Sequence, residues 1–252
     1  PADLDGATAP PANAPAGFLR HRACAAHGGS DSLEYFSFHV DWTTPANSTL
    51  TGPVSVPVAA FDSTLCGLTS FNCVPQPGTG TTLDPLREPT MWRNQYRNFG
   101  SHESIVGNMA VDVGSDRAGV RWFELRKVGA GAWALYQEGT YSPGTDNYWM
   151  ASAAQDLNGN LALAYNVASS STYPSLRYKG RISTAPLGTL PEAEQTIAAG
   201  DTSNGSNRYG DYAALTVDPS DDYTFWFTGQ WNDASSWSTR IDKFAFDQNP
   251  DF

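Results

Sequence analysis

The sequence has no long apolar run and little charge. No segment approaches the roughly 20 consecutive apolar residues that a membrane-spanning helix needs, and no long stretch shows the periodicity of an amphipathic helix. Charged residues make up only 16% of the 252 residues, whereas glycine occurs 23 times, proline 17 times, and aromatic residues make up 12%. These features predict a turn-rich, all-β protein whose sheets pack through aromatic side chains.

Lysine and arginine are also scarce. They number 15 against 26 aspartates and glutamates, which gives a net charge of −11. Nucleic acids and anionic membrane surfaces are bound by clustered basic side chains. We therefore expect no nucleic-acid partner and no membrane insertion. The acidity fits high solubility, cation binding or a neutral glycan partner, and does not choose among them.

Only three cysteines are present, Cys24, Cys66 and Cys73. Cys66 and Cys73 bracket a short loop and form either a local disulfide or a pair of buried thiols. The low lysine content and the many Ser, Thr, Asn and Gly residues look extracellular and favour the disulfide. Cys24 would then be buried or paired outside the chain, and no cysteine spacing indicates zinc. We expect a secreted or cell-surface protein.

Three segments of the chain repeat one pattern. Each has an apolar run, a tight turn rich in Asp, Asn, Gly or Ser, and a second apolar or aromatic run, which is the signature of a β-hairpin. The turns begin at Asp112, Asp156 and Asp218. Their spacing fits the four-stranded blades of a β-propeller better than any helical repeat.

The strand-like segments group into about four blades, each expected to be a four-stranded antiparallel sheet. The predicted blades cover residues 1–62, 87–142, 148–200 and 209–247, with a Cys-, Gly- and Thr-rich loop at 63–86. A short stretch at Asp3–Asp5 is assigned to the first blade, and the fourth blade shows only three strands. Either the first residues supply the missing strand, or the chain is half of a larger propeller.

We favour the second alternative because Pro1 is not a translation start and begins what looks like the first strand of a blade. The expected protein partner is then an upstream propeller half, or a second copy of the chain through self-association.

Several long motifs resemble known sequences. They are Pro1–Gly6, Phe38–Trp42 with Pro45–Thr49, Met91–Ser104, Gly119–Arg126, and Tyr209–Ala213 with Val217–Pro219. Together they resemble a group of large secreted bacterial proteins, mostly uncharacterised, that carry an extracellular propeller-like region. The resemblance implies that similar proteins have further propeller sequence upstream of the position matching Pro1, and it implies no reaction. The turn at 156–160 also resembles the Asp-box of sialidases, although it lacks the closing Thr-Trp, and this supports the fold rather than a chemistry.

Ligands of propellers usually lie at the mouth of the central channel, where the innermost strand of each blade begins. The residues expected there include arginines, carboxylates and aromatic rings: Asp3, Asp5, Arg87, Glu88, Trp92, Arg93, Tyr148, Trp149, Arg208, Tyr209, Asp211 and Tyr212. Rings can stack on the apolar face of a sugar while charged side chains bond its hydroxyl groups. The residues predicted to bind ligand are Arg93, Trp149, Arg208, Tyr209 and Asp211.

The alternative for these residues is structural. Arg208 with Asp211, and Arg93 with Glu88, would then form ion pairs that hold neighbouring blades together.

The catalytic candidates are weaker. His102 and Glu103 have the chemistry of an acid and a base, but neighbouring residues of a strand point to opposite faces. A glycoside hydrolase needs two carboxylates about 5–10 Å apart, for which Asp5, Glu88 and Asp211 are further candidates. A sialidase-like site would also need an arginine cluster and a tyrosine nucleophile, for which the chain offers Arg93, Arg208, Tyr209 and Tyr212. No Gly-x-Ser-x-Gly nucleophile elbow is present.

Two of the hairpin turns gather oxygen ligands of the kind that calcium prefers. One holds Asp156 and Asn158, and the other holds Asp218 and Asp221. The same residue types populate turns for backbone reasons alone, and the glutamate of an EF-hand is missing. We predict no required cofactor, and calcium is the one ion that these turns suggest.

The sequence therefore predicts a secreted β-propeller, or half of one, that acts as a binding or scaffold module with carbohydrate as the leading ligand class. The alternatives are a glycoside hydrolase with its site at the channel mouth, and a surface-assembly protein without a small ligand. Two carboxylates facing each other across a cleft would favour the hydrolase. An open aromatic-lined pocket without such a pair would favour sugar binding.

Overall fold

The computed structural model describes residues 1–67, 70–234 and 237–246. Strands dominate these ranges, together with a short helix, α1 (Cys24–His27), and a single 3₁₀ turn (Pro45–Asn47), so the prediction of an all-β protein is confirmed. Residues 68–69 of the expected loop and residue 247 of the expected fourth blade lie outside the described residues. Within them, no helix has the length and apolar character needed to cross a membrane.

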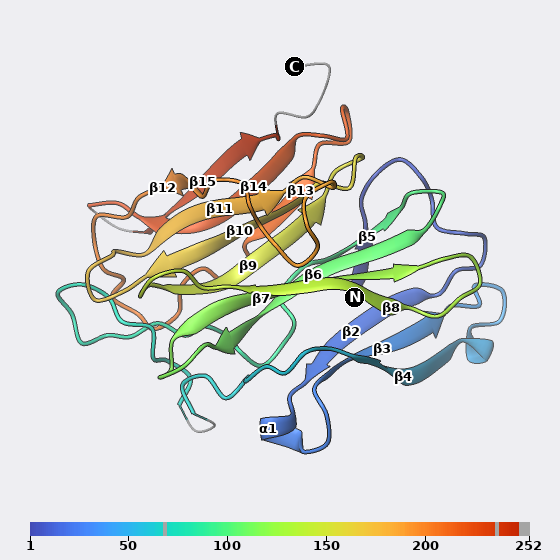
Figure 1. Cartoon of the computed structure of the whole chain (residues 1–252), viewed down its shortest axis with the longest axis horizontal. Coiled ribbons are helices and arrows are strands. Elements are labelled where there is room, and N and C mark those ends of the chain that lie inside the picture. The colour runs from blue at the N-terminus through green and yellow to red at the C-terminus, as the bar shows by residue number, and fades with distance from the viewer. Residues whose placement is uncertain (68–69, 235–236, 247–252) are drawn as a thin grey trace.

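Four sheets of three to five strands follow one another along the molecule (Figure 1). The first sheet has the order β2-β3-β4, with bounds Ala16–Arg22, Ser32–His39 and Thr49–Pro57. The second has the order β1-β5-β6-β7-β8, with bounds Ala2–Leu4, Asn94–Asn98, Glu103–Asp112, Ala118–Lys127 and Ala134–Tyr141. The third has the order β12-β11-β10-β9, with bounds Gln195–Ala198, Ser175–Arg181, Leu161–Ala168 and Asn147–Gln155. The fourth has the order β13-β14-β15, with bounds Ala214–Val217, Phe225–Asn232 and Trp237–Phe244.

The three predicted turns each join a pair of antiparallel strands, β6–β7, β9–β10 and β13–β14. In every case the first aspartate accepts a hydrogen bond from the backbone N–H two residues further on, at 2.7 Å for Asp112, 2.9 Å for Asp156 and 2.8 Å for Asp218. Aspartate favours turns because its side chain bonds its own backbone in this way. The repeat in the sequence is thus a repeat of turn chemistry.

The sheets differ from the expected blades in strand number and pairing. Only the third sheet has four antiparallel strands, whereas the others have three, five and three. Strand β1, which was assigned to the first blade, pairs in parallel with β5 of the second sheet. That assignment was wrong for an electrostatic reason: the carboxylates of Asp3 and Asp5 both bind Arg93, which directly precedes β5.

Consecutive sheets pack face to face, with an apolar core between each pair. The first and second sheets bury Leu33, Tyr35, Ile105 and Phe123; the second and third bury Val106, Trp122, Leu163 and Tyr165; the third and fourth bury Leu176, Leu215, Phe225 and Phe227. The third sheet is therefore covered on both faces. This explains why β10 is apolar along nearly its whole length instead of alternating with polar residues.

Between the sheets, the inner edges of β9 and β13 are satisfied by side chains rather than by another strand. The Gln95 carboxamide accepts from the backbone N–H of Gln155 at 2.6 Å and donates to its carbonyl at 3.1 Å. The Leu215 N–H donates to the Ser152 hydroxyl at 2.9 Å, and its carbonyl accepts from Arg93 at 3.2 Å. Buried backbone groups need such partners, so polar side chains fill the space where the inner strands meet.

Asp5 is the acidic centre of this network. Its side chain accepts from Arg93 and from the Gln95 amide, each at 2.9 Å, and from the backbone N–H of Val217 at 3.1 Å. These donors come from the second and the fourth sheet. One carboxylate near the N-terminus therefore connects two sheets that share no strand pairing among the described residues.

Replacing Asp5 with Asn should destabilise the fold far more than replacing Asp3 with Asn. Both carboxylates bind Arg93, but the Asp5 side chain is 12% exposed and the Asp3 side chain 48% exposed. Removing one partner of a buried ion pair costs about 3–5 kcal/mol, and an exposed pair contributes about 0–1 kcal/mol. Urea unfolding of the two variants measures the difference, and equal losses of unfolding free energy would contradict this account.

Candidate functional site

A cleft of about 400 Å³ opens where the inner strands β5 and β13 begin and where β9 is irregular. We call it the axial cleft. Its lining includes Leu19 from β2, Leu86 and the segment 89–94 around the start of β5, Met150 and Ala151 from β9, and Tyr212 and Ala213 from the loop before β13. Three of the twelve residues expected at the channel mouth line it, namely Trp92, Arg93 and Tyr212.

Three residues that line the axial cleft have left-handed backbone conformations without being glycine. The φ angles are 49° for Leu86, 44° for Met150 and 67° for Tyr212. Such a conformation costs an ordinary side chain about 1–2 kcal/mol, and strained residues of this kind concentrate at functional sites. Met150 also lies at an irregularity in the pairing of β9 with β10, and bulges often adjoin active sites.

Two exposed aromatic rings border the cleft. Trp92 is 51% exposed and Tyr212 is 79% exposed. Two buried polar side chains also line it: Arg93, whose guanidinium binds Asp3 and Asp5, and Asn94, whose Oδ1 has no hydrogen-bond partner within the described part of the chain. The cleft thus combines stacking surfaces with buried hydrogen-bonding groups.

Of the five residues predicted to bind ligand, only Arg93 lines this cleft. Trp149 and Tyr209 are almost fully buried and pack together with a ring separation of 6.3 Å. The Tyr209 hydroxyl donates to the Gln230 carbonyl at 2.9 Å. Neither ring offers a face to solvent in this structure, because both belong to the core beneath the cleft.

The ion pairs at the predicted rim form in part as expected. Arg208 binds Asp211 and lies 3.8 Å from Asp84. Arg93 pairs with Asp3 and Asp5 rather than with Glu88, which lies 3.4 Å from Arg87. The predicted Arg93–Glu88 pairing was therefore wrong, because the carboxylates of Asp3 and Asp5 bind Arg93 instead.

His102 directly precedes β6 and Glu103 is its first residue, and their side chains contact different groups. His102 stacks on Phe99 at 4.9 Å and its Nδ1 lies 3.0 Å from the Ser101 hydroxyl. Burial, followed by the charge of Arg126, lowers the pKa of His102. Glu103 faces a second pocket between the first and second sheets, so the two side chains do not act together.

This second pocket, which we call the inter-sheet pocket, has a volume of about 500 Å³. Its walls include the rings of Tyr35, Tyr96 and Trp133, and its polar groups include Glu103 and Lys127. Of these five residues, only Glu103 was a site candidate from the sequence. Trp133 lies in a loop and Tyr35 in a different sheet, so only the packing of two sheets brings them together.

The proposed calcium turns use their carboxylates to hold the backbone. Asp156 accepts from the N–H groups of Asn158 and Asn160, each at 2.9 Å. Asp218 accepts from Ser220 and from the Trp226 indole, and Asp221 accepts from Tyr223 and Thr224. Over the described ranges, no three His, Cys, Asp or Glu side chains are grouped closely enough to hold a metal ion.

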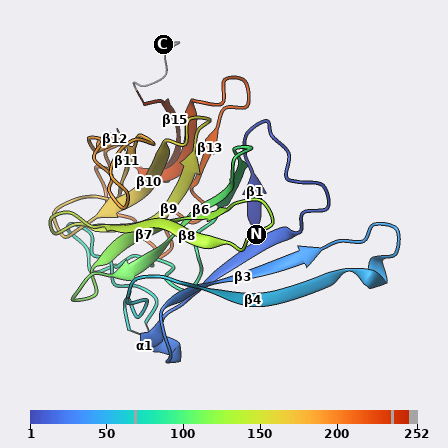
Figure 2. The same cartoon turned by 45° about the vertical axis from the view of Figure 1, so that its right-hand side comes forward.

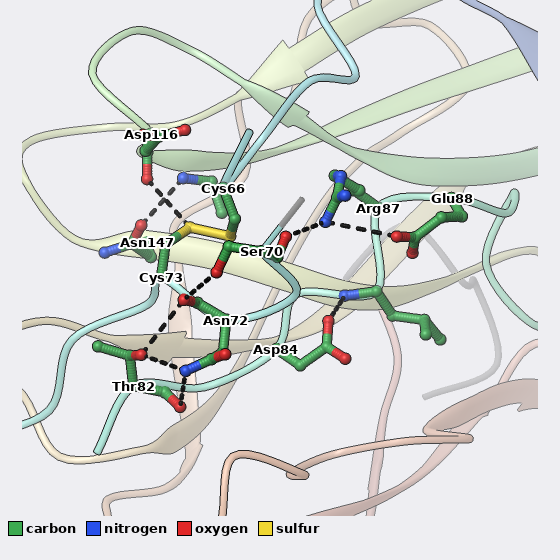
Figure 3. The surroundings of a disulfide bond; sticks show 12 residues. Cys66, Ser70, Asn72, Cys73, Thr82, Asp84, Arg87, Glu88, Asp116 and Asn147 are labelled. Carbon is green, nitrogen blue, oxygen red and sulfur yellow. Dashed lines mark hydrogen bonds and ion pairs between the residues drawn. A yellow bond between two sulfur atoms is a disulfide. The ribbon is translucent and has the colours of Figure 1, made fainter. Parts of the chain in front are cut away.

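The Cys66–Cys73 disulfide is present, with a Cα–Cα distance of 5.2 Å (Figure 3). Its Cys73 sulfur lies 3.7 Å from the Asp116 carbonyl, at the β6–β7 turn. Cys66 packs with Leu65, Val74 and Leu83 in the core beside Trp149. The disulfide therefore anchors the long loop to the body of the protein, and Cys24 is a free thiol.

Neither the family models nor the curated proteins give a match. Among solved structures, a xylan β-1,4-xylosidase from Bacillus halodurans C-125 shares 8% identity over 92% of this chain, with a TM-score of 0.39, and the match covers 41% of that enzyme. An α-L-arabinofuranosidase from Fusarium graminearum, in complex with an iminosugar inhibitor, shares 9% identity over 85% of this chain, with a TM-score of 0.36 and 67% of its own length covered. These TM-scores are too low to support an inference about this chain.

The Asp156 turn should give a specific pH dependence of stability. Burial raises the pKa of Asp156 from 3.8 to about 6, against the opposing effect of its hydrogen bonds. The folded state therefore holds this proton more tightly than the unfolded state, and the unfolding free energy should fall as the pH rises from about 4 to about 6. In the Asp156→Asn variant this fall should be absent. Denaturant unfolding across that range tests it, and parallel curves for the two proteins would refute it.

Proposed function

We propose that the chain is a propeller-like arc of sheets that binds carbohydrate in the axial cleft. The observation that carries the proposal is the combination, in one cleft, of two exposed aromatic rings with buried polar side chains and three strained backbone positions. Backbone strain of this kind lowers stability, and strained positions are typically retained where they shape a functional site.

The chemistry of the cleft suits a sugar ring. Trp92 and Tyr212 offer apolar faces for stacking. Arg93 supplies a charged group for hydroxyls, whereas the Asn94 oxygen is packed against Gly107 and has no hydrogen-bond partner among the described residues.

Binding is favoured over hydrolysis by the count of carboxylates. A glycoside hydrolase of the usual kind needs two of them across its cleft. The described lining of the axial cleft includes no carboxylate, and that of the inter-sheet pocket includes Glu103 alone. Asp3 and Asp5 lie near the axial cleft, but both are occupied by Arg93.

An extracellular location accompanies this proposal. The disulfide closes a loop of the kind that persists in oxidising compartments and is rare in the cytosol. Glycans are also abundant outside the cell, so location and ligand class agree.

Alanine at Trp92 or at Tyr212 should weaken glycan binding by about tenfold, because an aromatic anchor contributes about 1–2 kcal/mol to binding. Both rings are exposed, so the melting temperature should stay close to that of the parent protein. A glycan array with and without calcium identifies ligands, and titration calorimetry then compares the variants.

The matched control is Trp42→Ala, which removes a ring that is 88% exposed and does not line the axial cleft. Affinity that falls equally in Trp42→Ala and Trp92→Ala, or an array without any bound glycan, would count against the axial cleft.

A second candidate function, assembly with a second copy of the chain, is favoured by the outer face of the first sheet. Phe18 lies opposite Phe36, and Phe38 lies opposite Leu50, on the face turned away from the buried Leu33. Figure 2 shows that β3 and β4 extend away from the other sheets. Each internal sheet pair is held by apolar faces, and within the described residues no sheet packs on this outer face.

The Phe38→Ser/Leu50→Ser variant should then be monomeric, whereas the parent chain should associate with rising concentration, because the variant removes apolar area from this face. Sedimentation velocity over a concentration series measures both proteins. A parent chain that stays monomeric at every concentration would refute the assembly.

A further inference from the structure

One end of the inter-sheet pocket is formed by polar side chains that are hydrogen-bonded to one another. Glu103 is only 6% exposed, and its carboxylate accepts hydrogen bonds from the Tyr96 hydroxyl at 2.8 Å and from the Lys127 ammonium at 2.9 Å. Burial and the Glu103 carboxylate raise the pKa of Tyr96, so the phenol keeps its proton. A charged, hydrogen-bonded cluster therefore forms one end of a largely apolar pocket.

Aromatic rings form the walls beside this cluster. The Trp133 ring lies 5.7 Å from the Tyr35 ring and 6.4 Å from the Tyr96 ring, and the Lys127 ammonium lies 6.0 Å from the Trp133 ring. Gly17 also lines the pocket and leaves no room for a larger residue, since a Cβ there would come within 2.8 Å of the Tyr35 ring. The volume of about 500 Å³ is within the usual range of small-ligand sites.

The charges of the pocket select against charged ligands. Glu103 and Lys127 already neutralise each other, so an anion would face the Glu103 carboxylate and a cation would face the Lys127 ammonium. A carboxylate has about four acceptor positions and an ammonium has three donors. Both groups therefore retain hydrogen-bonding capacity for a neutral molecule that can donate to one and accept from the other.

We infer that the inter-sheet pocket is a second ligand site, which takes a neutral ring with adjacent hydroxyl groups, such as a pyranose. One hydroxyl donates to the Glu103 carboxylate, the neighbouring hydroxyl accepts from Lys127, and the apolar face of the ring packs against Trp133. The site uses different residues from the axial cleft, so it does not depend on the function proposed for that cleft.

A structural ion pair is the competing explanation for Glu103 and Lys127. A buried pair is weak evidence of a stabilising role, since apolar or neutral replacements of both partners are often tolerated. The Glu103→Gln/Lys127→Met variant removes both charges and keeps similar side-chain volumes. It should fold normally and bind the ligand more weakly.

Saturation-transfer NMR with methyl β-D-glucopyranoside tests the site in a chain whose axial cleft is disabled by Trp92→Ala/Tyr212→Ala. The probe should still bind to this chain. Adding Glu103→Gln/Lys127→Met, or Trp133→Ala alone, should weaken binding by about tenfold. Glucosamine and glucuronate, which carry a positive and a negative charge on the same ring, should bind about tenfold more weakly than the neutral glucoside.

The matched control is Glu34→Gln, which alters another buried glutamate, bonded to Arg20 at 2.5 Å and absent from the lining of the pocket. It should leave binding of the glucoside unchanged. The inference is overturned if the cleft-disabled chain shows no saturation transfer to the glucoside. It is also overturned if the glucoside binds equally well after the Glu103→Gln/Lys127→Met or the Trp133→Ala substitution, or if glucosamine or glucuronate binds more tightly than the glucoside. A loss of binding in Glu34→Gln as large as that in the pocket variants would also overturn it.

Discussion

The Asp5 carboxylate is the contact on which the arrangement of sheets depends. It lies where the inner strands of the second, third and fourth sheets meet, and it accepts from Arg93, from Gln95 and from the backbone of β13. No strand pairing joins these sheets among the described residues, so side chains must satisfy the inner backbone edges. The apolar cores hold the sheets face to face, and this polar network fixes where their inner ends converge.

The local part of this fold could be predicted from sequence, and the long-range part could not. Asp112, Asp156 and Asp218 start turns because a short acceptor bonds the N–H two residues on, which is a property of a few neighbouring residues. The pairing of β1 with β5 depends instead on carboxylates that meet Arg93 some ninety positions later in the chain. No local sequence pattern encodes such a long-range contact. For this reason β1 was predicted in the first sheet, whereas it pairs with β5 of the second sheet.

The same limit explains the outcome at the candidate site. The sequence predicts a ligand site at the start of the inner strands, and of the five residues predicted to bind ligand only Arg93 lines the axial cleft. It does not tell which aromatic rings face solvent: Trp149 and Tyr209 are core residues, whereas Trp92 and Tyr212 border the cleft. The alternation that separates inward from outward residues fails here, because Met150 lies at a bulge of β9 and Tyr212 has a left-handed backbone.

Strand β5 and the residue before it link both pockets. The side chains of Arg93, Gln95 and Arg97 reach the third and fourth sheets, where they bond to the backbone of Leu215 and Gln155. Tyr96 lies on the other face and holds Glu103 at the inter-sheet pocket. Because β5 makes polar contacts on both of its faces, its sequence lacks the apolar–polar alternation by which a strand is usually predicted. Arg93 lines the axial cleft and Tyr96 lines the inter-sheet pocket, so this short segment contributes to the walls of both.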